Sequence, residues 1–168
     1  MRSFIIIIFF IFIYIPAHNL AAQDIPDLIS LGVGYSDLND NEEAADLRLE
    51  YRWGAPLIWV LKPWVGIEAT SQESVLFGGG ILADIILNDS FYMTPSIGIG
   101  LYHQGAGKDL GLPVQFRTQF EAGYVFKNKS RLGISYGHIS NASLHDDNPG
   151  TEILGIYIHM PAEKLGFR

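Results

Sequence analysis

The chain has 168 residues, a net charge of −7 at neutral pH and no cysteine. The acidic balance argues against a nucleic-acid partner, and the lack of cysteine excludes a disulfide framework and a thiolate metal site. Because 48% of the residues are hydrophobic and 12% are aromatic, the fold must keep a large apolar surface away from water.

The first residues resemble a secretory signal peptide. Arg2 precedes an apolar run over residues 4–15, and the small residues Ala21 and Ala22 follow it. The run is shorter than the roughly 20 residues that a membrane-spanning helix needs, and no later apolar run reaches about 18 residues. We therefore expect residues 1–22 to be a signal peptide and residues 23–168 to form a single domain.

After residue 25 the hydrophobic pattern has a period of two, which is typical of β-strands. In residues 44–53, for example, Leu47, Leu49 and Tyr51 fall on one face, whereas Arg48 and Glu50 fall on the other. Such runs predict eight strands, near residues 28–36, 44–54, 59–70, 74–87, 90–102, 114–126, 129–140 and 151–161. Many reach about nine residues, the length that a tilted membrane strand requires.

The connections between these strands alternate in length. The segments at 54–58, 88–89 and 127–129 are short, whereas the loops at 37–43, 103–113 and 141–150 are longer and rich in Gly, Asn and Asp; only the connection near 71–73 departs from the alternation. Short turns on one side and longer loops on the other are typical of an outer-membrane β-barrel. We therefore predict an all-β fold, an eight-stranded antiparallel transmembrane barrel with both termini on the periplasmic side.

Charged residues recur on the polar faces of the strands. The set contains Arg48, Arg52, Lys62, Arg117, Asp46, Glu50, Glu68 and Glu121. An eight-stranded barrel has an interior that side chains can fill, and paired charges suit it better than unpaired ones. We therefore expect a filled interior and no pore.

A soluble lipocalin-like carrier would have the same alternation with its apolar face inside. Parity alone does not separate the two folds. The charge on the polar faces favours the membrane barrel, as do aromatic residues at strand ends, such as Trp53, Trp59 and Tyr124, which suit the girdles at a lipid interface.

Three polar residues interrupt the apolar faces of the last two strands. His138 and Ser140 continue the face of Leu132, Ile134 and Tyr136, and Glu152 continues the apolar face of its own strand beside loop 141–150. Residues two apart on a strand are separated by roughly 6.5–7 Å, and opposed residues on adjacent strands have Cβ atoms about 4.5–5.5 Å apart. The three side chains can therefore form a nucleophile, a base and an orienting acid.

Asn141 follows the serine and can donate its amide to an oxyanion. The next turn, Asn148-Pro149-Gly150, is expected to set the hairpin register and so hold Glu152 against His138. We interpret His145, Asp146 and Asp147 as a solvated turn or a contact to sugar or phosphate, and not as a cation site.

The segment from His138 to Glu152, "HISNASL…NPG…E", resembles the PagL family of lipid A 3-O-deacylases from Gram-negative outer membranes. The resemblance implies that Ser140 is the nucleophile, His138 the general base, Glu152 the residue that orients it and Asn141 an oxyanion contributor. It implies hydrolysis of the ester-linked 3-hydroxyacyl chain at the 3-position of lipid A, with no metal and no cofactor. Lipid A or lipopolysaccharide is then the partner of a membrane-embedded enzyme, and a homodimer is left open.

The alternative interpretation is a small structural or adhesive outer-membrane barrel of the OmpX kind, without catalytic activity. Labelling by a serine-directed probe distinguishes the enzyme from that barrel.

Overall fold

The computed structural model describes residues 25–38, 43–87 and 90–167. The predicted signal peptide, residues 1–22, lies outside these ranges. The described residues form nine strands and one short 3₁₀ helix, in chain order β1 (Leu28–Ser36), β2 (Ala44–Arg52), β3 (Leu61–Thr70), β4 (Val75–Ala83), β5 (Ile85–Leu87), β6 (Phe91–His103), β7 (Val114–Val125), β8 (Arg131–Ser140), β9 (Thr151–Pro161) and η2 (Ala162–Leu165).

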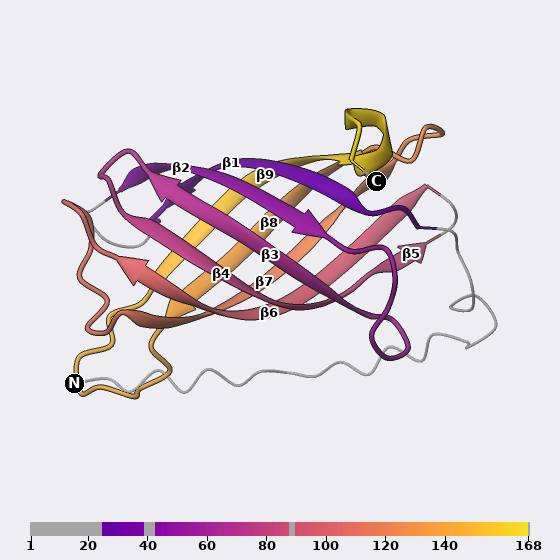
Figure 1. Cartoon of the computed structure of the whole chain (residues 1–168). Coiled ribbons are helices and arrows are strands. Elements are labelled where there is room, and N and C mark those ends of the chain that lie inside the picture. Colours follow the sequence, from indigo (N-terminus) through magenta and orange to yellow (C-terminus); the bar gives the residue numbers. More distant parts are fainter. Residues whose placement is uncertain (1–24, 39–42, 88–89, 168) are drawn as a thin grey trace.

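The strands form one closed antiparallel sheet (Figure 1). Apart from β4 and β5, each strand pairs with its neighbours in sequence, β1 pairs with β9, and a β4–β6 pairing completes the ring. Both β4 and β5 pair with β6, so they are successive parts of one interrupted strand. Counted in this way, the barrel has eight strands. The predicted eight-stranded antiparallel barrel is confirmed, and most predicted boundaries agree within two residues.

The strand predicted at 74–87 is broken at Asp84, which the sequence pattern did not reveal. Asp84 is buried, and its carboxylate lies 3.2 Å from Lys62 Nζ and 2.7 Å from Arg131 Nη1. On β6, Thr94 and Pro95 lie between the segments that pair with β4 and β5. Because proline has no N–H to donate, the ladder weakens there.

Apolar side chains cover the outside of the barrel, and polar side chains fill its interior. On β2, Leu47 and Leu49 are about half exposed (53% and 49%), whereas Arg48 and Glu50 are each only 2% exposed. This arrangement contradicts the lipocalin-like alternative, in which the apolar face would be inside. Trp53, Trp59 and Tyr124 are also exposed, as expected for interface aromatics.

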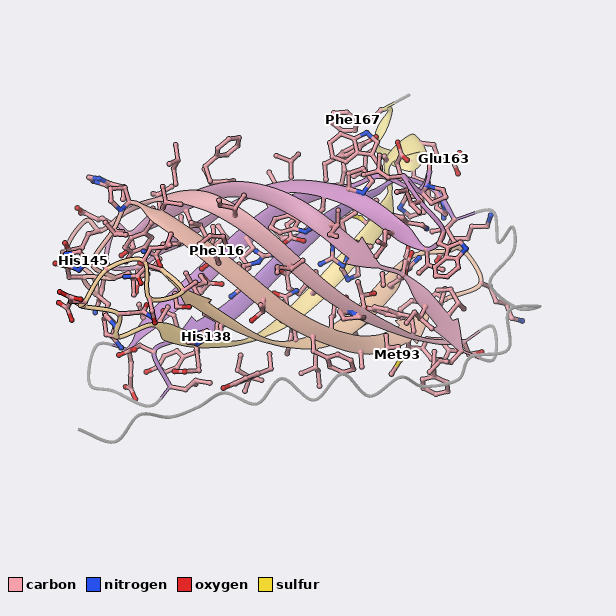
Figure 2. All side chains as sticks on the ribbon, turned by 90° about the horizontal axis from the view of Figure 1, so that it is seen from below. Met93, Phe116, His138, His145, Glu163 and Phe167 are labelled. Carbon is pink, nitrogen blue, oxygen red and sulfur yellow. The ribbon has the colours of Figure 1, made fainter. Side chains whose placement is uncertain are left out.

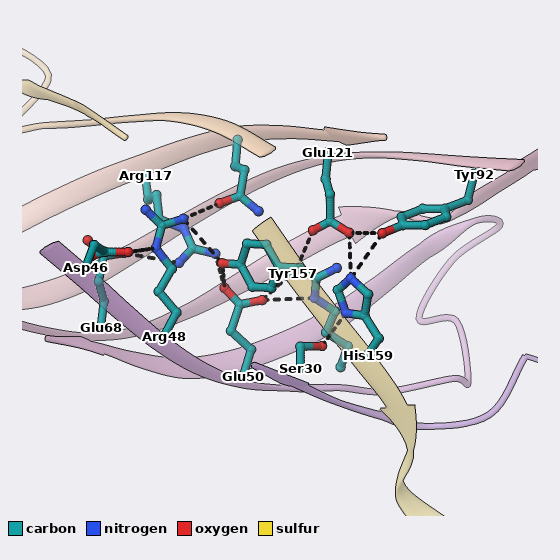
Figure 3. A network of polar contacts seen from close by, with 12 residues as sticks. Ser30, Asp46, Arg48, Glu50, Glu68, Tyr92, Arg117, Glu121, Tyr157 and His159 are labelled. Carbon is teal, nitrogen blue, oxygen red and sulfur yellow. Dashed lines mark hydrogen bonds and ion pairs between the residues drawn. The ribbon is translucent and has the colours of Figure 1, made fainter. Parts of the chain in front are cut away.

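Most interior charges form one continuous network (Figure 3), and Lys62, Asp84 and Arg131 form a second cluster. Arg48 Nε lies 2.6 Å from Asp46 and 3.1 Å from Glu68, and Arg52 Nη2 lies 2.8 Å from Glu50 and 2.9 Å from Glu121. Two small cavities within the barrel each offer about 10 Å³, which is room for about one water. The expectation of a filled interior is therefore confirmed.

The two ends of the barrel differ. Leu28 pairs with Pro161, so the first and last strands meet at the end that also carries the turns 53–60 and 126–130. The loops 71–74, 104–113 and 141–150 lie at the opposite end. Figure 2 shows His138 and His145 toward that loop end, and Glu163 and Phe167 at the other. The described parts of the chain contain no helix with the length and hydropathy needed to span a membrane.

Candidate active site

His138 and Glu152 are directly opposed on the neighbouring strands β8 and β9. His138 Nδ1 lies 3.3 Å from Glu152 Oε1, and the two side chains are 27% and 23% exposed. The strand alternation positions both, because His138 continues the outward row of Leu132, Ile134 and Tyr136. A partly exposed imidazole with a carboxylate at one nitrogen has its second nitrogen available for proton transfer.

Ser140 is the last residue of β8 and follows His138 on the same outward row. It is half-buried, and on its other side it faces Phe116 of β7. Within the described residues, no hydrogen bond joins Ser140 to His138. Catalytic hydrogen bonds are often long in a free enzyme and tighten when substrate binds, so the shared face and the spacing are the relevant features.

A fourth polar residue, on β7, lies on the same outer face. Thr118 is exposed and directly opposes His138, which in turn opposes Glu152. In the sequence, Thr118 is the one threonine within the apolar face of residues 114–126. The outer surface of three adjacent strands therefore carries a polar row at the loop end, beside apolar side chains such as Tyr136 and Leu154.

Asn141 lies on the opposite side of the chain from Ser140. It is fully buried, and its Nδ2 donates hydrogen bonds to the carbonyls of Leu110, 2.9 Å away, and Asp147, 2.8 Å away. Its backbone N–H donates to Asn148 Oδ1 at 3.0 Å. Both amide hydrogens of Asn141 are thus engaged, so in this arrangement the side chain joins two loops and does not face the serine. The physical reason is the period of two, which turns successive side chains to opposite faces.

The backbone that carries the site is packed from the interior by an apolar cluster. Leu76, Leu110, Ile139 and Ile153 form it, and the last three are at most 2% exposed. Ile139 lies between His138 and Ser140, and Ile153 follows Glu152, so each points inward where its neighbours point outward. Leu110 comes from loop 104–113, which folds into the barrel mouth. This packing could not be predicted from the hydrophobic pattern, since Leu110 lies in an irregular loop.

A contact with β1 fixes the start of β9. The Asp37 N–H donates a 2.8 Å hydrogen bond to the Glu152 carbonyl, and Lys108 Nζ lies 2.6 Å from Asp37 Oδ1. Thr151 Oγ1 also lies 3.5 Å from Asp37 Oδ1. Across the described ranges, no group of three or more His, Asp or Glu side chains is arranged to hold a metal ion.

A protein-family model described as "Lipid A 3-O-deacylase (PagL)" matches residues 29–161. A curated protein of Bordetella bronchiseptica, "Lipid A deacylase PagL", is 31% identical over 68 residues, which are 39% of this chain and 38% of the relative. The chain therefore matches well under half of that relative's length.

Among solved structures, the crystal structure of the outer membrane enzyme PagL is similar with a TM-score of 0.61 and 22% identity, over 80% of this chain and 99% of that chain. Neisserial surface protein A (NspA) gives a TM-score of 0.59 at 12% identity, over 80% and 96% of the two chains. At these identities the structural likeness shows the barrel fold alone.

Proposed function

The chain belongs to the PagL family of lipid A 3-O-deacylases, and we propose that it hydrolyses the ester of the 3-hydroxyacyl chain at the 3-position of lipid A in the Gram-negative outer membrane. One observation carries the proposal within this chain. A His138–Glu152 pair with Ser140 on the same face stands on the apolar outer surface of the barrel.

In the proposed mechanism, Ser140 Oγ attacks the acyl carbonyl carbon while His138 Nε2 takes its proton. Glu152 accepts a hydrogen bond from His138 Nδ1, which holds the tautomer that leaves Nε2 able to accept. When the tetrahedral intermediate collapses, the bond to the sugar oxygen breaks and His138 returns the proton to that oxygen. Water, deprotonated by His138, then attacks the acyl-serine carbonyl carbon. The bond to Ser140 Oγ breaks, His138 returns the proton to that oxygen, and the 3-hydroxy fatty acid leaves.

The position of the site explains how such a substrate is reached. Lipid A occupies the outer leaflet, and the three side chains lie at the loop end on the lipid-facing surface. Exposed Ile134, Tyr136, Leu154 and Ile156 continue that surface below the site. An acyl chain can lie against them while its ester meets Ser140, without leaving the bilayer. A homodimer is not needed, because all three side chains come from one chain.

The role proposed for Asn141 follows from its hydrogen bonds. An oxyanion role for its amide requires release of the Leu110 or Asp147 carbonyl. The contacts favour an indirect contribution, in which Asn141 holds loop 141–150 beside Ser140. We further propose that residues 1–22 are removed on export, which N-terminal sequencing of the mature protein tests.

The experiment is to incubate the folded protein with lipopolysaccharide in detergent and to weigh the lipid A by mass spectrometry. The expected result is loss of one hydroxyacyl group by the wild type and by Ser130→Ala, and no loss with Ser140→Ala. Intact lipid A with the wild type, or equal loss with Ser140→Ala, contradicts the proposal. The alternative is a structural or adhesive outer-membrane barrel without catalytic activity, and absence of labelling by a fluorophosphonate probe favours it.

A further inference from the structure

Gly150 lies against the ring of His138. The residue is buried, it directly precedes β9, and its backbone has a φ of +66°. A Cβ atom at this position would lie 2.7 Å from His138 Cε1 and 3.3 Å from His138 Nε2. The backbone at Gly150 therefore touches the edge of the imidazole that carries Nε2, the nitrogen to which the mechanism assigns the proton of Ser140.

The imidazole is thus bracketed by one short segment of chain. Glu152 lies at Nδ1, 3.3 Å away, and Gly150 lies at the Cε1–Nε2 edge. The hydrogen bond from the Asp37 N–H to the Glu152 carbonyl ties this segment to β1. Two of the contacts that orient the ring therefore come from residues two apart, at the start of β9 and directly before it.

The backbone conformation alone does not account for a glycine here. Other loops of this chain have side chains at a similar φ, including Asp37 at 62°, Lys129 at 64° and Ser143 at 62°. What distinguishes position 150 is the neighbouring ring. Because a Cβ and the ring cannot both occupy that space, one of them must move, and the partly exposed His138 side chain is more easily displaced than the barrel backbone.

We propose that Gly150 is a positioning residue of the hydrolase: the absence of a side chain keeps the space in which the His138 imidazole meets Glu152 with one nitrogen and serves Ser140 with the other. This inference rests on the proposed function. A substitution at Gly150 displaces the ring while the barrel stays folded, so activity falls much more than stability.

The test compares Gly150→Ala and Gly150→Asn with Gly166→Ala. Asparagine tolerates a positive φ but carries a Cβ, and Gly166 has a φ of +85° with no atom within 4 Å of an added Cβ. The folded fraction of each variant is measured from its heat-modifiable mobility on a gel. Because a misplacement of 1 Å can slow catalysis about 100-fold, we expect kcat to fall about 10- to 100-fold in both Gly150 variants, with little change in KM. Gly166→Ala is expected to behave like the wild type.

A second readout does not depend on turnover. The nitrogen NMR signals of the His138 imidazole, assigned with His138→Gln, should shift in Gly150→Ala and not in Gly166→Ala. Folded Gly150 variants with wild-type kcat and unshifted signals overturn the inference, and so does failure of both variants to fold, which makes the glycine a structural requirement. An inactive wild type whose Ser140 is not labelled overturns the proposed function itself, so the two failures are distinguishable.

Discussion

His138 and Glu152 face each other across the β8–β9 ladder, with Nδ1 and Oε1 3.3 Å apart, on a surface whose other side chains are mostly apolar. This pair links the strand register directly to the proposed chemistry, because a slip by one residue would turn Glu152 into the barrel.

The pair predicts the effect of Glu152→Gln. An amide cannot hold the imidazole in the required tautomer, and in a buried serine triad the matching change lowers kcat about 10⁴-fold. Glu152 is partly exposed, so we expect a smaller loss, about 100-fold, measured as hydroxyacyl release by mass spectrometry. Glu163→Gln, at the far end of the barrel, is the control. Equal rates for the two variants would remove Glu152 from the mechanism.

Asn141→Ala is expected to loosen two loops at once. The change removes the hydrogen bonds of Asn141 to the Leu110 carbonyl, which still accepts from Gln115 Nε2 at 3.3 Å, and to the part-buried Asp147 carbonyl, at a cost of about 0.5–1.5 kcal/mol for each bond. Limited proteolysis and amide hydrogen exchange should show faster opening of loop 141–150, together with lower activity. A variant with unchanged loop protection and lost kcat would instead favour a direct role of Asn141 at the oxyanion.

The interior network predicts a large loss of stability in Glu121→Gln. Glu121 contacts Arg52 at 2.9 Å, His159 at 2.7 Å and Tyr92 at 2.5 Å, and it is fully buried. Removing one partner of such a cluster leaves a buried charge uncompensated and costs about 3–5 kcal/mol. Urea unfolding in detergent micelles, followed by tryptophan fluorescence, measures the change. Glu163→Gln should shift the midpoint very little.

The outward face predicts a dependence on depth in the membrane. Ile134 is 63% exposed within an apolar row, and Ile134→Lys is expected to destabilise the barrel by about 2–4 kcal/mol if that position lies near the bilayer midplane. Tyr35 lies at the loop end of β1, so the loss of stability caused by Tyr35→Lys should fall to about 0–1 kcal/mol. Folding yield into lipid vesicles compares the two, and equal yields would argue against a lipid-facing surface.

Most of the barrel could be predicted because alternation and loop length are local properties of the chain. A period of two predicts the eight barrel strands and the inward direction of the charged side chains. It also predicts that His138, Ser140 and Glu152 point outward. The break at Asp84 could not be predicted, because it depends on ion pairs with Lys62 and Arg131 from other strands. The inward direction of Asn141 could have been predicted from the alternation, because Asn141 directly follows the outward-pointing Ser140. The packing of Leu110 in the apolar cluster and the contact of Gly150 with His138 depend on loop conformation. The hydrophobic period of the strands carries no information about it.

The filling of the barrel interior by side chains has a kinetic consequence for the proposed hydrolase. Because side chains fill the barrel interior in the described part of the chain, substrate must arrive and fatty acid must depart sideways, within the plane of the leaflet. Turnover should therefore obey surface-dilution kinetics and depend on the mole fraction of lipid A in the film or micelle, not on its concentration in the bulk solution.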